Sequence, residues 1–150
     1  MQDPPDTESI ESTVGAWIAA WGAEVAGVDM STARRRFSPD VVSFGTFAEV
    51  VHGLDELEEQ QWRNVWPRID GFAFRVDELV VIASPDGRQA VAVVPWDSIG
   101  KADDGTPFAR PGRATVVLRR DSPGGPWLGV HTHFSLVPPP IAFPGHAGRA

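Results

Sequence analysis

The sequence predicts an α+β fold in which a strongly curved antiparallel sheet wraps, as a cone, around a long N-terminal helix. Three observations predict it: a long amphipathic segment near the start, two shorter helical segments after it, and four long strand-like segments in the second half. The long helix has one apolar stripe and the sheet one apolar face, so each can bury its apolar side against the other. The predicted fold therefore has three helices packed inside one bent sheet.

The apolar stripe of the first helix is regular. Its residues follow one another at steps of four, three, four, four and three: Ile10, Val14, Trp17, Trp21, Val25 and Val28. This is the spacing of one helix face. Asp6 or Thr7 can cap its start. A short second helix is predicted over 31–37, and a third over 54–66, where Pro67 ends it.

The strand-like segments are rich in Val, Phe, Ile and Thr and are separated by turn sequences. Two short strands are predicted over 41–46 and 49–52, and four long ones follow at 72–83, 89–99, 108–120 and 127–137. Strands joined by such short turns form an antiparallel meander. Pro95 lies inside the second long strand, where it cannot donate a ladder hydrogen bond, so we expect a bulge or a sheet edge there.

Composition limits the classes of function. Among 150 residues, 20 acidic side chains outnumber 13 basic ones, and the net charge of −7 argues against nucleic acid as a partner. Cysteine is absent, which excludes disulfides and thiol nucleophiles, and tyrosine is absent too. The six tryptophans and eight phenylalanines suit a core or the lining of a pocket.

One domain is predicted over 8–137, between a flexible N-terminus at 1–7 and a Pro-rich tail at 138–150. The first residues are acidic, unlike the basic start of a signal peptide. No apolar run approaches the ~20 residues of a transmembrane helix. We therefore expect a cytoplasmic protein with no membrane partner.

Five segments carry a family resemblance. They are DVVSFGT (40–46), VVHGLDEL (50–57), PWDS (95–98), RATVVLRR (113–120) and WLGVHTHFS (127–135). Together with the order of elements, they resemble SnoaL-like members of the nuclear transport factor two-like superfamily. The last segment is most similar to the association domain of calcium/calmodulin-dependent kinase. The resemblance implies a cone with a buried apolar pocket, and a homodimer formed through the outer sheet faces.

The superfamily includes isomerases, dehydratases, hydrolases, cyclases and non-catalytic assembly domains, so the fold alone does not select an activity. In ketosteroid isomerase the base lies in the segment matching 43–46, where this chain has no acid. The tyrosine of its first helix has no counterpart, because Trp17 and Trp21 occupy that stripe. This departure argues against the same proton-shuttle chemistry.

Three polar residues are the candidate catalytic groups. In a strand, His131 and His133 share one face with Trp127, Gly129 and Ser135. They could act as an acid–base pair or bind a metal, although no third ligand is evident. The alternative is that this face is the half-polar, dimer-facing side. The other face is more apolar and is predicted to line the interior; it carries Leu128, Val130, Thr132, Phe134 and Leu136.

Asp97 is the third candidate, because a bulge at Pro95 could turn its side chain inward. A carboxylate in an aromatic cavity would have a raised pKa and could serve as a general acid or base. The alternative is a solvated aspartate on the outer face.

The pocket itself is predicted from bulky side chains on several elements. The predicted ligand-binding residues are Trp17, Trp21, Phe44, Trp62, Trp66, Trp96, Thr115, Thr132 and Phe134. Such rings could simply form a core, but a converging set seldom fills a cone completely. We expect an apolar small-molecule ligand, bound without a cofactor or metal.

Three functions remain open. The first is a small-molecule-binding protein, with possible activity as a cofactor-independent isomerase, cyclase, dehydratase or hydrolase. The second is a non-catalytic ligand-binding or assembly module. The third, least favoured, is a metal-dependent enzyme using His131 and His133.

Overall fold

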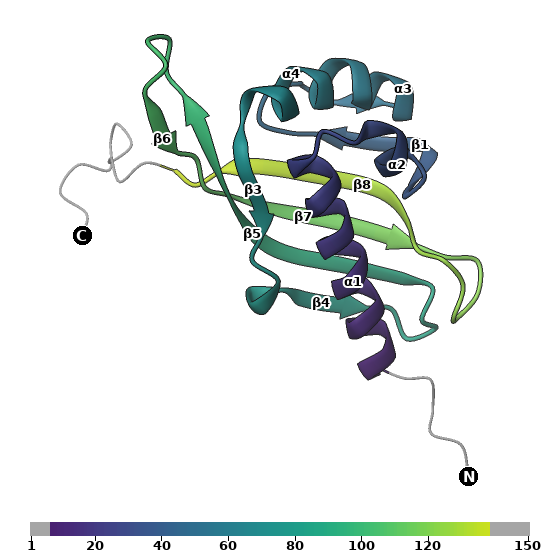
Figure 1. Cartoon of the computed structure of the whole chain (residues 1–150). Helices are drawn as coiled ribbons and strands as arrows, with labels where there is room; N and C mark the ends of the chain where they lie inside the picture. Colours follow the sequence, from purple (N-terminus) through teal and green to yellow (C-terminus); the bar gives the residue numbers. More distant parts are fainter. Residues whose placement is uncertain (1–6, 139–150) are drawn as a thin grey trace, which may run out of the picture.

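The computed structural model describes residues 7–138, which form a mixed sheet with helices on one face (Figure 1). The chain begins with α1 (Thr7–Ala26) and α2 (Met30–Arg34). A helical segment follows after two strands; it comprises α3 (Leu54–Glu56), a π-helical part (Leu57–Trp62), α4 (Arg63–Val65) and a 3₁₀ turn (Trp66–Arg68). The predicted α+β class, long N-terminal helix and two further helical segments are confirmed. The predicted termini at 1–7 and 138–150 lie almost wholly outside the described residues.

Within residues 7–138, eight strands make the sheet. They are β1 (Phe37–Phe44), β2 (Val51–His52), β3 (Asp70–Phe74), β4 (Val80–Ala83), β5 (Gln89–Lys101), β6 (Pro107–Ala109), β7 (Gly112–Arg119) and β8 (Leu128–Leu136). The order is β2-β1-β8-β7-β5-β3, and β4 and β6 also pair with β5. All pairs are antiparallel except β1 with β8, which is parallel. The sheet is therefore mixed rather than purely antiparallel, because the first and last long strands meet.

Two predicted long strands are each divided. The segment 72–83 becomes β3 and β4, separated by a 3₁₀ turn at Val76–Glu78. The interruption lies beside Pro95, whose carbonyl accepts a hydrogen bond from Arg75 N at 2.9 Å. The segment 108–120 becomes β6 and β7, separated at Pro111, which has no N–H for the ladder.

Of the two alternatives predicted at Pro95, a bulge or a sheet edge, the bulge is wrong, and Pro95 has no ladder partner on the side of β3 and β4. Pairing between β5 and β7 runs without a shift through Pro95 and Arg113, and the next pair is Trp96 with Gly112. Within a strand the nitrogen and carbonyl of one residue point to the same side. The missing N–H of Pro95 therefore faces the gap between β3 and β4, where no ladder bond is lost.

The core lies between α1 and the sheet. Trp21 is 2% exposed, and its ring packs edge-on against Phe37 and Phe134, with centroid distances of 4.9 and 5.5 Å. The predicted stripe is confirmed for four residues that are buried, Val14, Trp17, Trp21 and Val25, and fails at Val28. Val28 lies beyond the end of α1 with a φ of 53° and is exposed.

Because β8 contains a bulge, its first residues face the opposite way from the prediction. Leu118 pairs with Gly129 and Val117 with His131, so Val130 is an extra residue in the ladder. Gly129 therefore faces inward, against the ring of Phe37, and Leu128 lies on the outer face. The alternation predicted from the sequence holds only after the bulge, where Thr132 is buried and His133 exposed, and it fails again at Leu136, which is 45% exposed although predicted to face inward.

No helix within residues 7–138 is both long enough and apolar enough to cross a membrane.

A candidate ligand pocket

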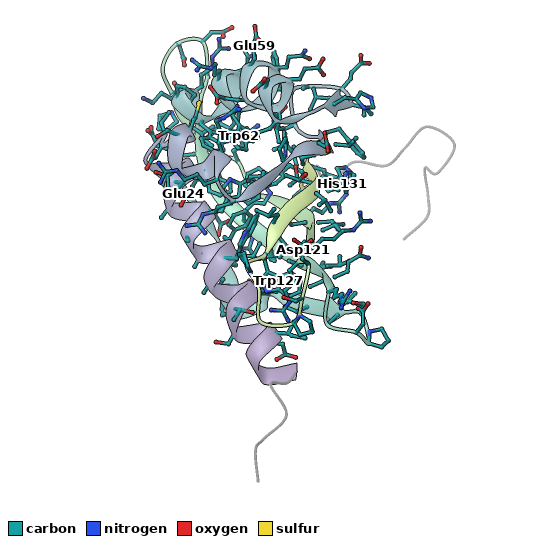
Figure 2. The ribbon with its side chains drawn as sticks, turned by 90° about the vertical axis from the view of Figure 1, so that its right-hand side faces the viewer. Glu24, Glu59, Trp62, Asp121, Trp127 and His131 are labelled. Atoms are coloured by element: carbon teal, nitrogen blue, oxygen red, sulfur yellow. The ribbon has the colours of Figure 1, made fainter. Side chains whose placement is uncertain are left out.

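An aromatic pocket lies between the end of α1, the helical segment over 54–68 and the concave face of the sheet. The rings that line it are Trp21, Trp62, Trp66, Phe72, Trp96 and Phe134. Figure 2 shows Trp62 beneath the helical segment that carries it, on the side facing the sheet. Trp62 and Trp66 stack with centroids 4.5 Å apart. The rings fill most of the predicted chamber and leave a cavity of about 40 Å³.

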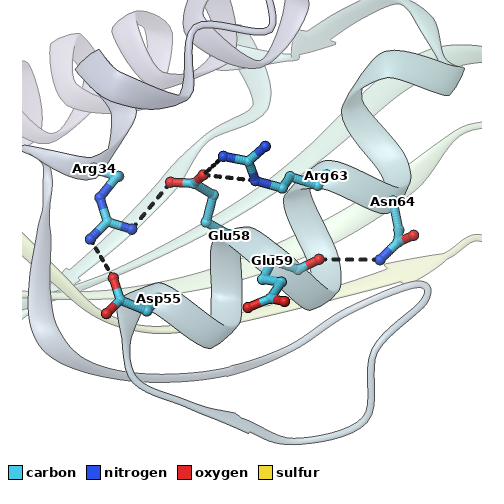
Figure 3. Close-up of polar contacts among 6 residues, drawn as sticks. All are labelled: Arg34, Asp55, Glu58, Glu59, Arg63 and Asn64. Carbon is cyan, nitrogen blue, oxygen red and sulfur yellow. Dashed lines mark hydrogen bonds and ion pairs between the residues drawn. The ribbon is translucent and has the colours of Figure 1, made fainter.

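The helical segment is π-helical over Leu57–Trp62, which places Gln61 and Trp62 at the pocket. A π-helical turn displaces backbone bonds, and such turns occur often at functional sites. Within this segment the Asn64 Nδ2 donates to Gln60 O at 2.9 Å and to Glu59 O at 3.3 Å. Figure 3 shows the second of these bonds.

An ion-pair network attaches this segment to α2 (Figure 3). Arg34 Nη2 lies 2.6 Å from Asp55 Oδ1, and its Nη1 lies 3.1 Å from Glu58 Oε1. The second oxygen of Glu58 accepts a hydrogen bond from Arg63 Nε at 2.9 Å. Glu58 is mostly buried between the two arginines, so the network fixes where the helical segment sits over the sheet.

Polar groups gather at one end of the pocket, which we call the mouth: Thr46, Gln61 and Arg110. Arg110 Nη2 donates to Thr46 Oγ1 at 2.9 Å, and its Cζ lies 5.6 Å from the centroid of the Trp96 ring. Burial lowers the pKa of the Arg110 guanidinium, which nevertheless stays charged at neutral pH. Gln61 Oε1 accepts from Ala48 N at 2.6 Å, so the loop after β1 is held to the helical segment.

Two lining residues carry buried N–H groups without a partner. The Nε1 atoms of Trp21 and Trp96 have no hydrogen-bond acceptor among the described residues. The Nε1 of Trp127, by contrast, donates to Thr13 Oγ1 at 3.0 Å. The Nε1 of Trp17, which does not line this pocket, is also without an acceptor among the described residues, so the missing partner is shared by tryptophans of the packed core.

Six predicted ligand-binding residues line this pocket: Trp21, Trp62, Trp66, Trp96, Thr132 and Phe134. The Thr132 hydroxyl donates to Ser43 Oγ at 2.8 Å and so joins β8 to β1. Phe44 borders the pocket, but its ring lies against that of His133, 4.1 Å between centroids.

The other two predicted ligand-binding residues lie elsewhere. Trp17 lines a separate surface groove with Trp127, because it lies one turn before Trp21 on α1. Thr115 pairs with His133 and Val93, so it lies on the outer face of the sheet with them.

The three predicted catalytic residues lie on the outer face of the sheet and do not line the pocket. Asp97 is ion-paired with Arg75, Nε to Oδ2 at 3.0 Å, and its side chain is 56% exposed. The uninterrupted pairing of β5 leaves it facing outward. His131 Nδ1 lies 2.7 Å from Val42 O, and His133 is exposed. Figure 2 shows His131 on the side of the sheet opposite α1.

Sequence reasoning missed the mouth residues. Gln61 had a usable signal, since it is the polar member of an otherwise apolar helical stripe formed with Leu54, Leu57 and Val65. Arg110 had no such signal in the sequence. It lies in the short connection between β6 and β7, and the pairing of these strands with β5 determines its position. Within residues 7–138 no group of three or more His, Asp or Glu side chains is arranged to hold a metal.

Comparison with known proteins identifies the fold and the family. The sequence model of the SnoaL-like domain matches residues 10–140. The chain belongs to this family. A comparison with curated protein sequences finds no match.

Solved structures of nuclear transport factor 2-like proteins share the fold of this SnoaL-like domain. A superfamily protein from Salmonella enterica has a TM-score of 0.73 at 17% identity, covering 97% of this chain and 99% of its own. A ketosteroid isomerase-like protein from Erwinia carotovora has 0.73 at 18%, covering 89% and 100%. The association domain of Caenorhabditis elegans CaMKII has 0.67 at 11%, covering 88% and 99%. At these identities the likeness concerns the fold.

Proposed function

We propose that this SnoaL-like domain binds a small, flat and mainly apolar molecule in the aromatic pocket. The observation that carries the proposal is the converging set of six rings with a single polar mouth. Binding sites for small molecules combine an apolar lining with a few placed polar groups in this way. Related structures include a ketosteroid isomerase-like protein, which is consistent with a small-molecule site.

Binding is favoured over acid–base chemistry at this pocket. Among the described residues that line it there is no carboxylate and no imidazole. Isomerase, cyclase, dehydratase or hydrolase activity using Asp97, His131 or His133 would need these side chains to act from the other face of the sheet. The mouth offers instead a permanent positive charge, on Arg110, which can bind or stabilise negative charge on a ligand.

A ring-sized ligand needs more room than the pocket has. An engineered apolar cavity that binds benzene measures about 150 Å³, against about 40 Å³ here. The half-buried lining side chains are less tightly enclosed than the buried rings, and they include Val65 and Ile69 on the walls and Arg110 at the mouth. We therefore expect a ligand to enter through the mouth and to move these side chains.

Replacing Val65 with phenylalanine is expected to weaken ligand binding about tenfold or more, since the larger ring occupies the space a ligand must enter. The measurement is saturation-transfer NMR and calorimetry with three neutral probes: toluene, cyclohexanone and benzamide. The matched control is Val76→Phe, on an exposed turn away from the pocket. Equal binding by both variants would contradict the proposal, as would no binding of any probe by the unmodified chain.

We also propose a homodimer formed through the outer face of the sheet. Apolar side chains are exposed there on neighbouring strands, with Val80 at 56%, Ile82 at 59% and Val93 at 41%. Val80 pairs with Val93 and Ile82 with Val91, so these side chains form one continuous patch. A patch of this kind on a sheet is typical of an interface.

Replacing Val93 with aspartate is expected to weaken the dimer about tenfold or more, because it buries a charge in the patch. Sedimentation velocity over a concentration series measures it, with Val50→Asp, exposed in the loop before β2, as the control. A monomer at all concentrations in the unmodified chain would refute the dimer. A ring of several dimers would favour the assembly function instead.

A further inference from the structure

We infer that the ligand is an organic anion, a small apolar ring that carries a carboxylate, with the carboxylate on the Arg110 guanidinium and the ring against the aromatic walls. This inference rests on the proposed function of the pocket and names the chemical class of its ligand.

Among the described residues, Arg110 has no acidic partner. No carboxylate of residues 10–138 lies within ion-pair distance of it, whereas the half-buried Arg34, Arg36 and Arg75 each have at least one. Arg120 is half-buried and also lacks one, but it donates to Gly87 O and lies over the Trp127 ring. Among the described residues that line the aromatic pocket, Arg110 is the one that carries a charge.

Arg110 is half-buried and has one side-chain hydrogen bond to the described protein, to Thr46. A guanidinium has five N–H donors. Removing part of its hydration without an anion is unfavourable, and a bound carboxylate would restore the lost interaction.

The shape and charge of the mouth suit a carboxylate. A planar guanidinium fork binds a carboxylate through two parallel N–H···O bonds. Thr46 and Gln61 beside it are neutral, and Gln61 Oε1 is already engaged by Ala48 N. One positive charge among neutral groups matches a monoanion better than a phosphate ester with two charges.

The apolar walls of the pocket begin directly beside the positive charge of Arg110. The Arg110 Cζ lies 5.6 Å from the centroid of Trp96, whose ring lies 5.4 Å from Phe72 and 5.9 Å from Phe134. A ring attached directly to a carboxylate would therefore meet these three side chains.

The test compares benzoate with benzamide, which have nearly the same shape and differ in charge, by calorimetry on the full chain at low ionic strength. We expect benzoate to bind at least about tenfold tighter than benzamide, as charge-assisted bonds are the stronger ones. Arg110→Gln should abolish this preference while benzamide binding persists, which also shows that the variant is folded. Arg110→Lys should recover part of it, since it keeps the charge and loses the fork.

Arg113→Gln is the matched control, because this arginine lies on the outer face and donates to Ser135 Oγ. It should leave the preference unchanged. Equal affinity for both probes, or a preference that survives Arg110→Gln, would overturn the anion inference and leave the pocket's proposed function standing. Failure of benzoate, benzamide and the other neutral probes to bind would overturn both.

Discussion

Replacing Trp21 with alanine is expected to lower the free energy of unfolding by about 3–5 kcal/mol, the usual cost of removing a large buried ring. Trp21 is 2% exposed, and its ring contacts four others, on Trp17, Phe37, Phe74 and Phe134. It joins α1 to both the sheet and the pocket wall. Urea unfolding followed by circular dichroism gives the difference.

Trp21→Phe is the informative companion variant. It keeps an aromatic ring in the same place and removes only the outer part of the indole and an N–H that has no partner. We expect it to cost clearly less than the alanine variant. A loss below about 1 kcal/mol for Trp21→Ala would be typical of an exposed site and would contradict the packing of α1 described above.

Replacing Gly112 with alanine is expected to destabilise the protein by about 3 kcal/mol, at the upper end of the usual cost of overpacking. A Cβ at Gly112 would overlap Cζ2 of Trp96 and lie 2.6 Å from Ser135 O. The backbone oxygen belongs to a paired strand and cannot move away. Trp96 would have to shift, which would also reshape the pocket.

Gly15 offers the matched control for the same chemical change. It lies within α1, where a Cβ would meet only Leu79 Cδ2 at 3.8 Å, an ordinary contact. Gly15→Ala should therefore stabilise the protein by about 0.5–1 kcal/mol, because alanine favours a helix over glycine by this amount. Urea unfolding of both variants tests the pair, and the same sign for both changes would contradict the account.

Elements whose apolar residues recur at a regular spacing could be predicted from the sequence. The stripe of α1 depends on local spacing alone, so Val14, Trp17, Trp21 and Val25 are buried as expected. The parallel pairing of β1 with β8 could not be predicted, because it joins segments about ninety residues apart that carry no shared local signal. The bulge at Val130 reverses the facing of Leu128 and Gly129, since a shift of one residue exchanges the two faces of a strand.

The residues of the candidate site also fall into those that local sequence could predict and those that it could not. Rings on helices and regular strands, such as Trp62 and Trp96, could be assigned to the pocket from their elements. Asp97 could not be placed, because its orientation depended on whether β5 bulges at Pro95, and pairing with β7 keeps β5 regular. Arg110 reaches the mouth from between two strands, which only the assembled sheet determines.

Binding in the aromatic pocket can be followed through the indole N–H signals of the six tryptophans. Each signal can be assigned in a ¹⁵N-labelled sample by single Trp→Phe replacements, and benzoate is then added in steps. The account predicts that the signals of Trp21 and Trp96 move, while that of Trp127, bonded to Thr13, stays in place. Unmoved Trp21 and Trp96 signals in the presence of bound benzoate would place the ligand elsewhere and contradict it.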